Sequence, residues 1–130
     1  MIALDTNLLA QLLLRDDKGQ HARVKALLAG TQLFTAPVTV FLELVWVLEA
    51  NDRTPIEIQK GLTLLLGLPN FRPIHAAVVR AALAHYAQGM DFGDALHLGL
   101  SSGDQAFMTI DKAFVRKAGK LAVSPQVRAV

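Results

Sequence analysis

The chain begins with Met1-Ile2-Ala3-Leu4-Asp5-Thr6-Asn7, a short apolar run that ends abruptly in a carboxylate, a hydroxyl and an amide. An apolar run of this length at the start of a chain predicts a buried strand. In open α/β sheets, ligands bind and chemistry takes place where strands end. We therefore expect Asp5 to lie on a rigid floor at the mouth of a crevice, where further acidic residues can meet it.

Beyond this run, strand-like apolar segments alternate with helical patterns. The alternation predicts an α/β fold with a mostly parallel central sheet flanked by helices. About five strands are expected, at residues 1–4, 33–36, 71–74, 106–110 and 121–123. Pro73 would confine the third of these to a sheet edge or to its first rungs, because proline cannot donate a ladder hydrogen bond.

Capping residues mark where the expected helices begin. Thr54-Pro55-Ile56-Glu57 has the spacing of a capping box with proline at the first helical position, so a helix is expected to start there. Asp16-Asp17 can cap an earlier helix, and Thr39 can cap a long apolar one. Gly89 fits the C-terminal end of an alanine-rich helix.

Size and composition bound the architecture. The chain has 130 residues, of which 52% are hydrophobic, enough for one domain with a real core and too few for two. Its apolar stretches fall short of a membrane span and no signal-peptide pattern is present, so we expect a single domain over residues 1–130 in the cytoplasm. The lack of cysteine excludes disulfides, thiolate zinc sites and cysteine nucleophiles.

The charge distribution is uneven. The net charge of +2 is only a mild lean toward polyanions. No acid follows Asp111 in the C-terminal segment, whose cations are Lys112, Arg116, Lys117, Lys120 and Arg128. This segment is either a solvated face or a rim that binds phosphate.

Three of the 11 acidic residues stand out because their neighbours are apolar. Asp5 and Asp111 each follow an expected strand, and helix capping is the alternative explanation for both. Glu43 lies within an almost wholly apolar helical stretch, which is expected to be buried. A buried carboxylate without a partner is costly, so Glu43 needs a cation, a set of donors or a metal ion.

Asp91 and Asp94 open a further expected helix that runs to about Ser101. Carboxylates in a first turn can cap N–H groups and favour the helix dipole, which accounts for one of the two. Asp94 is harder to explain in this way, since it leads directly into an apolar stretch. His97 shares a helix face with Asp94. A mixed Asp/His metal site is conceivable there, although a histidine among leucines is more often a core or interface residue.

Several carboxylates at one place repel one another, and such a cluster usually exists to bind a hard divalent cation. Mg²⁺ and Mn²⁺ prefer oxygen ligands. A metal bound in this way can lower the pKa of a water molecule and stabilise charge on a phosphodiester during hydrolysis. Thr6, Asn7 and Thr109 would supply hydrogen bonds that orient the carboxylates.

Five short segments follow one another in a set order over nearly the whole chain: Leu4-Asp5-Thr6-Asn7, Leu14-Arg15-Asp16-Asp17, Glu43, Asp91-Phe92-Gly93-Asp94-Ala95-Leu96-His97 and Thr109-Ile110-Asp111-Lys112-Ala113-Phe114. In this order and spacing the sequence resembles the PIN-domain family and, within it, the VapC toxins of bacterial toxin–antitoxin pairs. The resemblance implies a PIN-like sheet of parallel strands flanked by helices. It also implies a metal-dependent endoribonuclease.

The resemblance assigns roles to particular residues. The catalytic and metal-binding quartet of the family matches Asp5, Glu43, Asp94 and Asp111. Asp91 looks like the extra carboxylate of some members, which either binds metal through water or caps the helix. The polar residue beside the first acid matches Thr6 or, better, Asn7. The family also implies an RNA substrate, a homodimer and a small VapB-like antitoxin as partners.

The leading hypothesis is hydrolysis of an RNA phosphodiester with one or two Mg²⁺ or Mn²⁺ ions as cofactor. Arg15, Lys112 and Arg116 are candidates for contacts with backbone phosphates, and plain surface solubility is the alternative for each. A non-catalytic RNA-binding PIN domain is a second hypothesis. A receiver-like phosphoacceptor module is a third, but Asp5 is not followed by a second acid and the chain has no Lys-Pro pair.

Two helices carry more apolar side chains than a small domain usually buries. They are Trp46, Val47 and Leu48 on one helix and Leu62, Leu64, Leu65 and Leu66 on the next. They form either a dense core or a surface for a partner.

Overall fold

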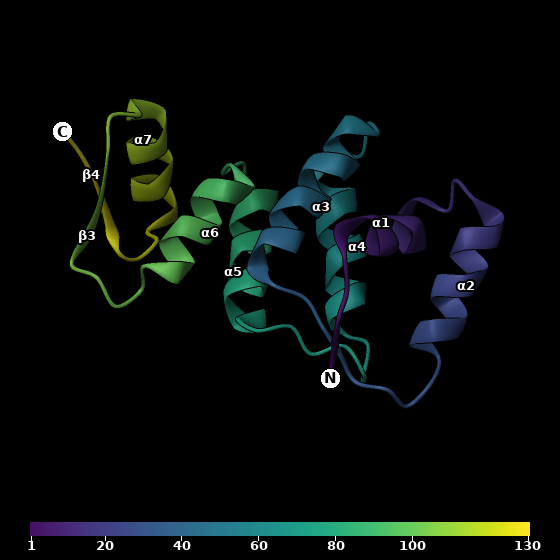
Figure 1. The fold of residues 1–130 in the computed structure, drawn as a ribbon. Coiled ribbons are helices and arrows are strands. Elements are labelled where there is room, and N and C mark those ends of the chain that lie inside the picture. The colour runs from purple at the N-terminus through teal and green to yellow at the C-terminus, as the bar shows by residue number, and fades with distance from the viewer. The chain divides into compact units, whose positions relative to one another are not determined.

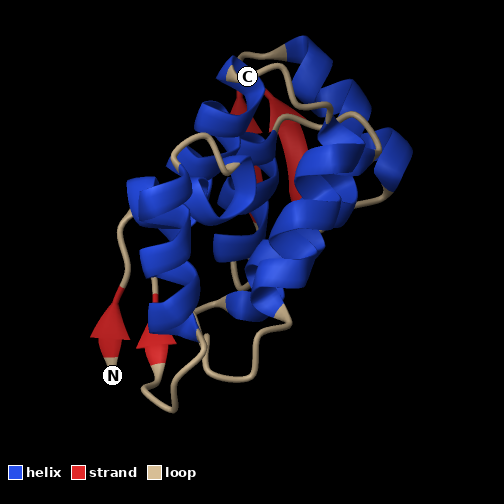
Figure 2. Ribbon diagram, turned by 90° about the vertical axis from the view of Figure 1, so that its right-hand side faces the viewer, coloured by secondary structure: helices blue, strands red, loops and turns tan.

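The computed structural model describes all 130 residues, which form two compact units, Met1–Ala76 and Ala77–Val130. Helices dominate both units and every strand is short (Figure 2). The first unit contains β1 (Ile2–Ala3), α1 (Thr6–Leu14), α2 (Lys18–Leu28), β2 (Phe34–Thr35), α3 (Val38–Ala50) and α4 (Pro55–Leu66). The rest of the chain contains α5 (Ala76–Ala87), α6 (Phe92–Leu100), β3 (Ala106–Thr109), α7 (Lys112–Leu121) and β4 (Gln126–Ala129).

In the first unit, β1 and β2 are parallel, with Ile2 opposite Phe34 and Ala3 opposite Thr35. The chain leaves β1 directly into α1, which packs against both α2 and α3 (Figure 1). Apolar side chains from these elements are fully buried and make the core of the unit: Leu9, Phe34, Phe41, Leu44, Ile58 and Leu62. The first turn of α1 is therefore fixed on a packed base.

The loop between α2 and β2 is held by one buried amide. Asn70 is 8% exposed, and its Nδ2 donates to the carbonyl oxygens of Leu28 at 2.9 Å, Gly30 at 3.3 Å and Gln32 at 3.3 Å. These bonds satisfy backbone groups that would otherwise be left without partners beside the core. They also tie the end of α2 to the segment that follows α4.

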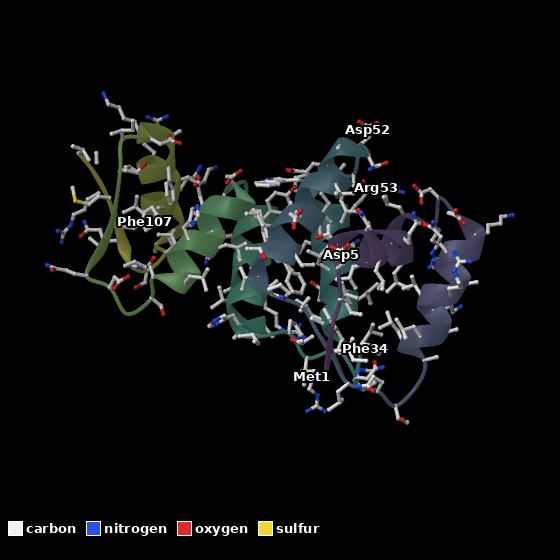
Figure 3. The ribbon with its side chains drawn as sticks, viewed as in Figure 1. Met1, Asp5, Phe34, Asp52, Arg53 and Phe107 are labelled. Atoms are coloured by element: carbon white, nitrogen blue, oxygen red, sulfur yellow. The ribbon has the colours of Figure 1, made fainter.

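In the second unit, β3 and β4 are parallel, with Ala106 opposite Gln126 and Thr109 opposite Ala129. α7 packs on both strands (Figure 1). Phe107, labelled in Figure 3, joins β3 to the two neighbouring helices. Its ring stacks on His97 of α6 at 5.9 Å and lies 5.8 Å from that of Phe114 of α7. His97 thus has an aromatic packing partner.

Several expected boundaries are confirmed. Thr54 and Glu57 form a complete capping box with Pro55 at the start of α4. Asp17 caps α2 by accepting a hydrogen bond from the N–H of Gln20 at 3.0 Å. Gly89 follows α5 with a φ of 105°, a left-handed conformation in which a side chain would be strained. No helix is long and apolar enough to cross a membrane.

The sheet differs from the expected one of about five strands. Four strands form two separate two-stranded parallel sheets, and residues 71–74 contribute only a bridge between Phe71 and Phe34. At this bridge the N–H of Phe34 donates to the carbonyl oxygen of Asn70 at 2.8 Å and the N–H of Arg72 donates to that of Phe34 at 2.7 Å, and pairing goes no further. The α/β class and parallel pairing are confirmed, whereas one continuous sheet is not found.

Two other boundaries were wrong. Residues 121–123, expected as a strand, are the end of α7 and its left-handed cap at Ala122, and the strand lies instead at Gln126–Ala129. Pairing begins at Gln126, which lies opposite Ala106. Thr39 does not cap α3, because that helix begins at Val38 with Pro37 at the cap position.

Candidate active site

Asp5 lies where β1 gives way to α1, as the sequence predicts (Figure 3), but the expected burial of the strand was wrong, because both residues of β1 are exposed. It is the N-cap of α1, with extended φ and ψ of −86° and 159°, and its Oδ1 accepts a hydrogen bond from the N–H of Thr6 at 2.7 Å. The side chain is exposed. Its Oδ2 has no hydrogen bond, so one carboxylate oxygen remains open to a ligand.

Thr6 connects Asp5 to a second acid far along the chain. The threonine is only 5% exposed, and its Oγ1 donates to Oε1 of Glu43 on α3 at 3.4 Å. The hydroxyl therefore orients the carboxylate of Glu43, as expected for Thr6. Asn7 makes no such bond and instead lines a cavity of about 440 Å³ between α1 and α2.

The expected burial of Glu43 was wrong, because this side chain is exposed. α3 is apolar in sequence, but one side of it is open, and Trp46 on the same helix is 56% exposed. Water therefore solvates Glu43 directly. Because Glu43 is exposed, it needs no partner to offset burial. The hydrogen bond from Thr6 fixes its carboxylate.

The second unit brings three carboxylates to one hollow. Asp91, Asp94 and Asp111 line a cavity of about 200 Å³, together with Met90, Phe114 and Lys117. Asp91 and Asp94 come from the start of α6, and Asp111 comes from the turn between β3 and α7. A strand-end acid and two first-turn acids of α6 therefore line the same cavity within this unit.

Two of these acids are helix caps. Oδ2 of Asp91 accepts a hydrogen bond from the N–H of Asp94 at 3.0 Å. Oδ1 of Asp111 accepts from the N–H groups of Ala113 at 2.9 Å and Phe114 at 3.1 Å. The N–H of Asp111 in turn donates to Oγ1 of Thr109 at 3.0 Å, so Thr109 holds the turn that presents this acid.

Asp94 differs from both caps, because no backbone N–H group bonds to its side chain. Burial raises the pKa of the Asp94 carboxyl, the charge of Asp91 raises it further, His97 partly opposes the shift, and Asp111 adds a smaller increase. The negative charge of Asp94 is therefore the least well compensated in the cavity. A cation bound there would offset the repulsion between these carboxylates directly.

Lys117 is the residue of this cavity that the sequence did not assign to the site. It lies on α7 with Phe114, one turn apart on the same helix face. A Cβ atom placed on Gly89 would come within 3.2 Å of its Nζ, so the missing side chain of Gly89 leaves room for the ammonium group. The sequence had placed Lys117 only among the cations of the C-terminal segment that follows Asp111.

The other expected cations lie elsewhere. Lys112 and Arg116 are on α7 and exposed, and neither lines the acidic cavity. Arg15 follows α1 and lines a separate cavity of the first unit. The structure therefore gives Lys112 and Arg116 no role beyond an exposed positive charge.

The family model of the PIN domain matches residues 2–120. The chain belongs to the PIN domain family. Proteins with this domain are generally nuclease-like and commonly use divalent metal ions such as Mg²⁺. No curated protein matches the chain. The match extends over elements of both compact units of the PIN domain and includes every acidic residue described above.

The donor chemistry of this PIN domain fits a hard divalent cation. In neither unit do three or more histidine, aspartate or glutamate side chains come close enough together to hold an ion by themselves. Asp5 and Asp111 each commit one carboxylate oxygen to a helix and leave the other open, and Asp94 leaves both. Mg²⁺ keeps several waters and needs only one or two direct carboxylates, so the oxygen donors of Asp94 and Asp111 in the cavity of the second unit are of the kind that it prefers.

Proposed function

We propose that this PIN domain is a metal-dependent endoribonuclease that acts as the toxin of a toxin–antitoxin pair. The observation that carries the proposal is the cavity lined by Asp91, Asp94 and Asp111, in which the pKa of Asp94 is raised, first by burial. Perturbed carboxylates in a cleft are typical of functional sites. We also propose that residues 1–130 work as one PIN domain, since the family match runs through both units.

In this proposal Asp5, Glu43, Asp94 and Asp111 hold Mg²⁺ or Mn²⁺. The metal ion, when bound, activates water and neutralises charge on the phosphodiester. Thr6 orients Glu43 through its hydroxyl, and Thr109 fixes the turn of Asp111. Asn7, the polar residue next to Thr6, would also help to orient the carboxylates around the metal ion.

Asp91 and Lys117 have supporting roles. Asp91 already uses Oδ2 to cap α6, and its charge keeps the pKa of Asp94 high until a cation arrives. Lys117 lies in the same cavity and donates to a non-bridging oxygen of the RNA phosphate. The cavity thus offers acids for the ion and one cation for the phosphate.

The test compares Asp94→Asn with Asp104→Asn, a matched loss of one exposed charge on the loop before β3. Each purified variant is incubated with fluorescently labelled single-stranded RNA and Mg²⁺. We expect Asp94→Asn to lose cleavage by roughly a hundred- to a thousandfold, the size typical of one electrostatic contributor, and Asp104→Asn to keep it. Full cleavage by folded Asp94→Asn would contradict the proposal. Binding of RNA by the unmodified chain without turnover would favour a non-catalytic RNA-binding PIN domain.

The partners form a separate part of the proposal. Trp46 on α3 is 56% exposed, and Ile56 and Leu64 on α4 are 50% and 75% exposed. Leu48, Leu62, Leu65 and Leu66 are buried and belong to the core, whereas the exposed apolar groups support a partner surface beside it. We propose a homodimer and a small VapB-like antitoxin. Light scattering after size exclusion tests the dimer, and a monomer at high micromolar concentration would contradict it.

A further inference from the structure

A second cavity, of about 300 Å³, lies in the first unit on the side of α1 and α2 that holds Arg15. Its floor is apolar and consists of Leu12, Leu28 and Leu68. Three basic residues surround the floor: Arg15 just after α1, and His21 and Lys25 on α2. We call this the basic cavity.

The charges of the basic cavity are not neutralised within the chain. No acidic side chain lines it. Asp17, the nearest acid along α2, is already engaged as the helix cap through the N–H of Gln20. Unpaired cations around an apolar floor suit a ligand that is anionic at one end and flat and apolar at the other.

His21 adds a polar group of defined direction. Its Nδ1 lies 3.1 Å from the carbonyl oxygen of Gln11. A carbonyl oxygen can only accept, so Nδ1 carries the hydrogen, and Nε2 of the neutral ring is left as an acceptor. A sugar hydroxyl is the kind of group that donates to it.

Arg15 is held in place by its backbone. Its backbone φ is 57°, and its N–H donates to the carbonyl oxygen of Gln11 at 3.1 Å. This left-handed residue ends α1. Glycine is the usual residue in this left-handed position. The chain places an arginine there instead, with a planar guanidinium that matches phosphate oxygens in pairs.

The basic cavity is distinct from the acidic residues of the proposed active site. Asp5 caps the first turn of α1 and Arg15 follows its last turn. Ten residues of helix correspond to about 15 Å, so the two side chains do not reach the same phosphate group.

We propose that the basic cavity binds a nucleoside monophosphate unit. Arg15 and Lys25 contact the phosphate, Nε2 of His21 accepts from a ribose hydroxyl, and the leucine floor packs on the base. A cavity of about 300 Å³ is at the small end of ligand sites, which fits one nucleotide rather than a peptide helix. The nucleotide belongs either to an RNA strand or to a free mononucleotide. Binding of a nucleotide in the basic cavity does not depend on cleavage of RNA by the chain.

The test uses the full chain carrying Asp94→Asn, without metal, so that cleavage plays no part. Calorimetry measures binding of adenosine 5′-monophosphate, adenosine and inorganic phosphate. The double variant Arg15→Gln/Lys25→Gln is compared with Lys18→Gln/Arg23→Gln, which removes the same two residue types from exposed positions outside this cavity. Circular dichroism checks that each variant is folded.

We expect the mononucleotide to bind more tightly than either of its parts. The cavity variant should weaken it about tenfold or more, the loss typical of one charge-assisted hydrogen bond, and the control less than about twofold. Ala29→Leu, which narrows the cavity at its exposed edge without changing any charge, should weaken the mononucleotide more than inorganic phosphate. This variant separates a shaped cavity from a diffuse positive field.

Competition with a short RNA oligomer identifies the source of the nucleotide. If a short RNA oligomer competes with the mononucleotide and loses affinity in the same double variant, the unit belongs to an RNA strand. If the oligomer is insensitive to that variant, the site takes a free mononucleotide. Equal losses in the cavity and control variants would overturn the inference. Binding of an acidic peptide in place of the mononucleotide would overturn it in favour of a protein partner.

Discussion

Two strand-to-helix turns of this molecule share one design and differ in what surrounds them. In the first unit β1 leads through Asp5 into α1, and in the second β3 leads through Asp111 into α7. Each aspartate caps its helix with Oδ1, and each has a threonine beside it that fixes an acid, Thr6 for Glu43 and Thr109 for Asp111. Asp5 bonds to one N–H group, whereas Asp111 bonds to two and also faces Asp94.

The comparison shows that an aspartate that caps a helix with one carboxylate oxygen keeps a second oxygen that could bind a metal ion. The helix takes one oxygen and leaves the other free. Asp94 is the contrasting case, because it has no backbone donor and carries its charge uncompensated. Removing a capping acid should therefore cost stability and activity together, whereas removing Asp94 should cost activity alone.

The largest expected effect concerns Asp5. Asp5→Asn keeps an acceptor for the N–H of Thr6 but removes the charge, and Asp5→Ala removes both. We expect both to reduce RNA cleavage by roughly a hundred- to a thousandfold, because both remove the carboxylate proposed to bind the metal ion. Initial rates at saturating Mg²⁺ measure this loss. A variant Asp5→Asn that cleaves as fast as the unmodified chain would show that Asp5 is a cap and nothing more.

The next effect is on stability at Asp111. Asp111→Ala leaves the N–H groups of Ala113 and Phe114 without their acceptor and should lower the free energy of unfolding by about 1 kcal/mol. Asp111→Asn should cost clearly less, since asparagine also caps well. Urea unfolding followed by circular dichroism separates the two. Equal losses would mean that the turn is held by something other than the cap.

A smaller effect follows from the pKa of Asp94. Because this pKa is raised in the folded state, mainly by burial, the folded chain binds more protons than the unfolded one between the usual carboxyl pKa and the raised value. Stability contributed by this residue is therefore lost as pH rises through that window. Asp94→Asn should be slightly more stable than the unmodified chain above the window, by a small amount because water screens this partly exposed carboxylate. The difference should vanish below it. Unfolding at a series of pH values, without metal, checks the sign, and a reversed sign would refute the assignment.

The smallest expected effect is that of Asp91→Asn. The cap of α6 is retained, so stability should change little. Loss of the neighbouring charge should lower the pKa of Asp94, which NMR of the side-chain carboxyl can follow. Cleavage should fall much less than in Asp94→Asn. A loss as large as that of Asp94→Asn would instead make Asp91 a direct ligand.

Local signals in the sequence predicted local structure well. The strand-end position of Asp5, the capping box at Thr54 and the helix opened by Asp91 each depend on chemistry within a few residues, and all are present. Exposure of Glu43 could not be read in this way, because it depends on which elements cover α3. Lys117 was missed for the same reason, since only packing brings α7 beside Gly89.

The sheet was overestimated on similar grounds. The apolar residues at 71–74 suggested a full strand, but their pairing is limited to a single bridge between Phe71 and Phe34. The last strand lies four residues beyond Ala122, the left-handed end of α7. Patterns of hydrophobicity identify which segments are apolar, whereas strand pairing depends on how those segments pack beside one another.

The hydrogen bonds of Asn70 control how the end of α2 opens locally. Its two N–H groups are shared among three carbonyl oxygens, including that of Leu28, whose side chain forms part of the basic cavity. Local opening that breaks these three hydrogen bonds would release the end of α2 and one wall of the basic cavity together. A ligand that requires the intact wall would raise the free energy of that opening. Hydrogen exchange at the N–H groups of residues 28–32 would then slow as the cavity fills, reporting occupancy from the far side of its wall.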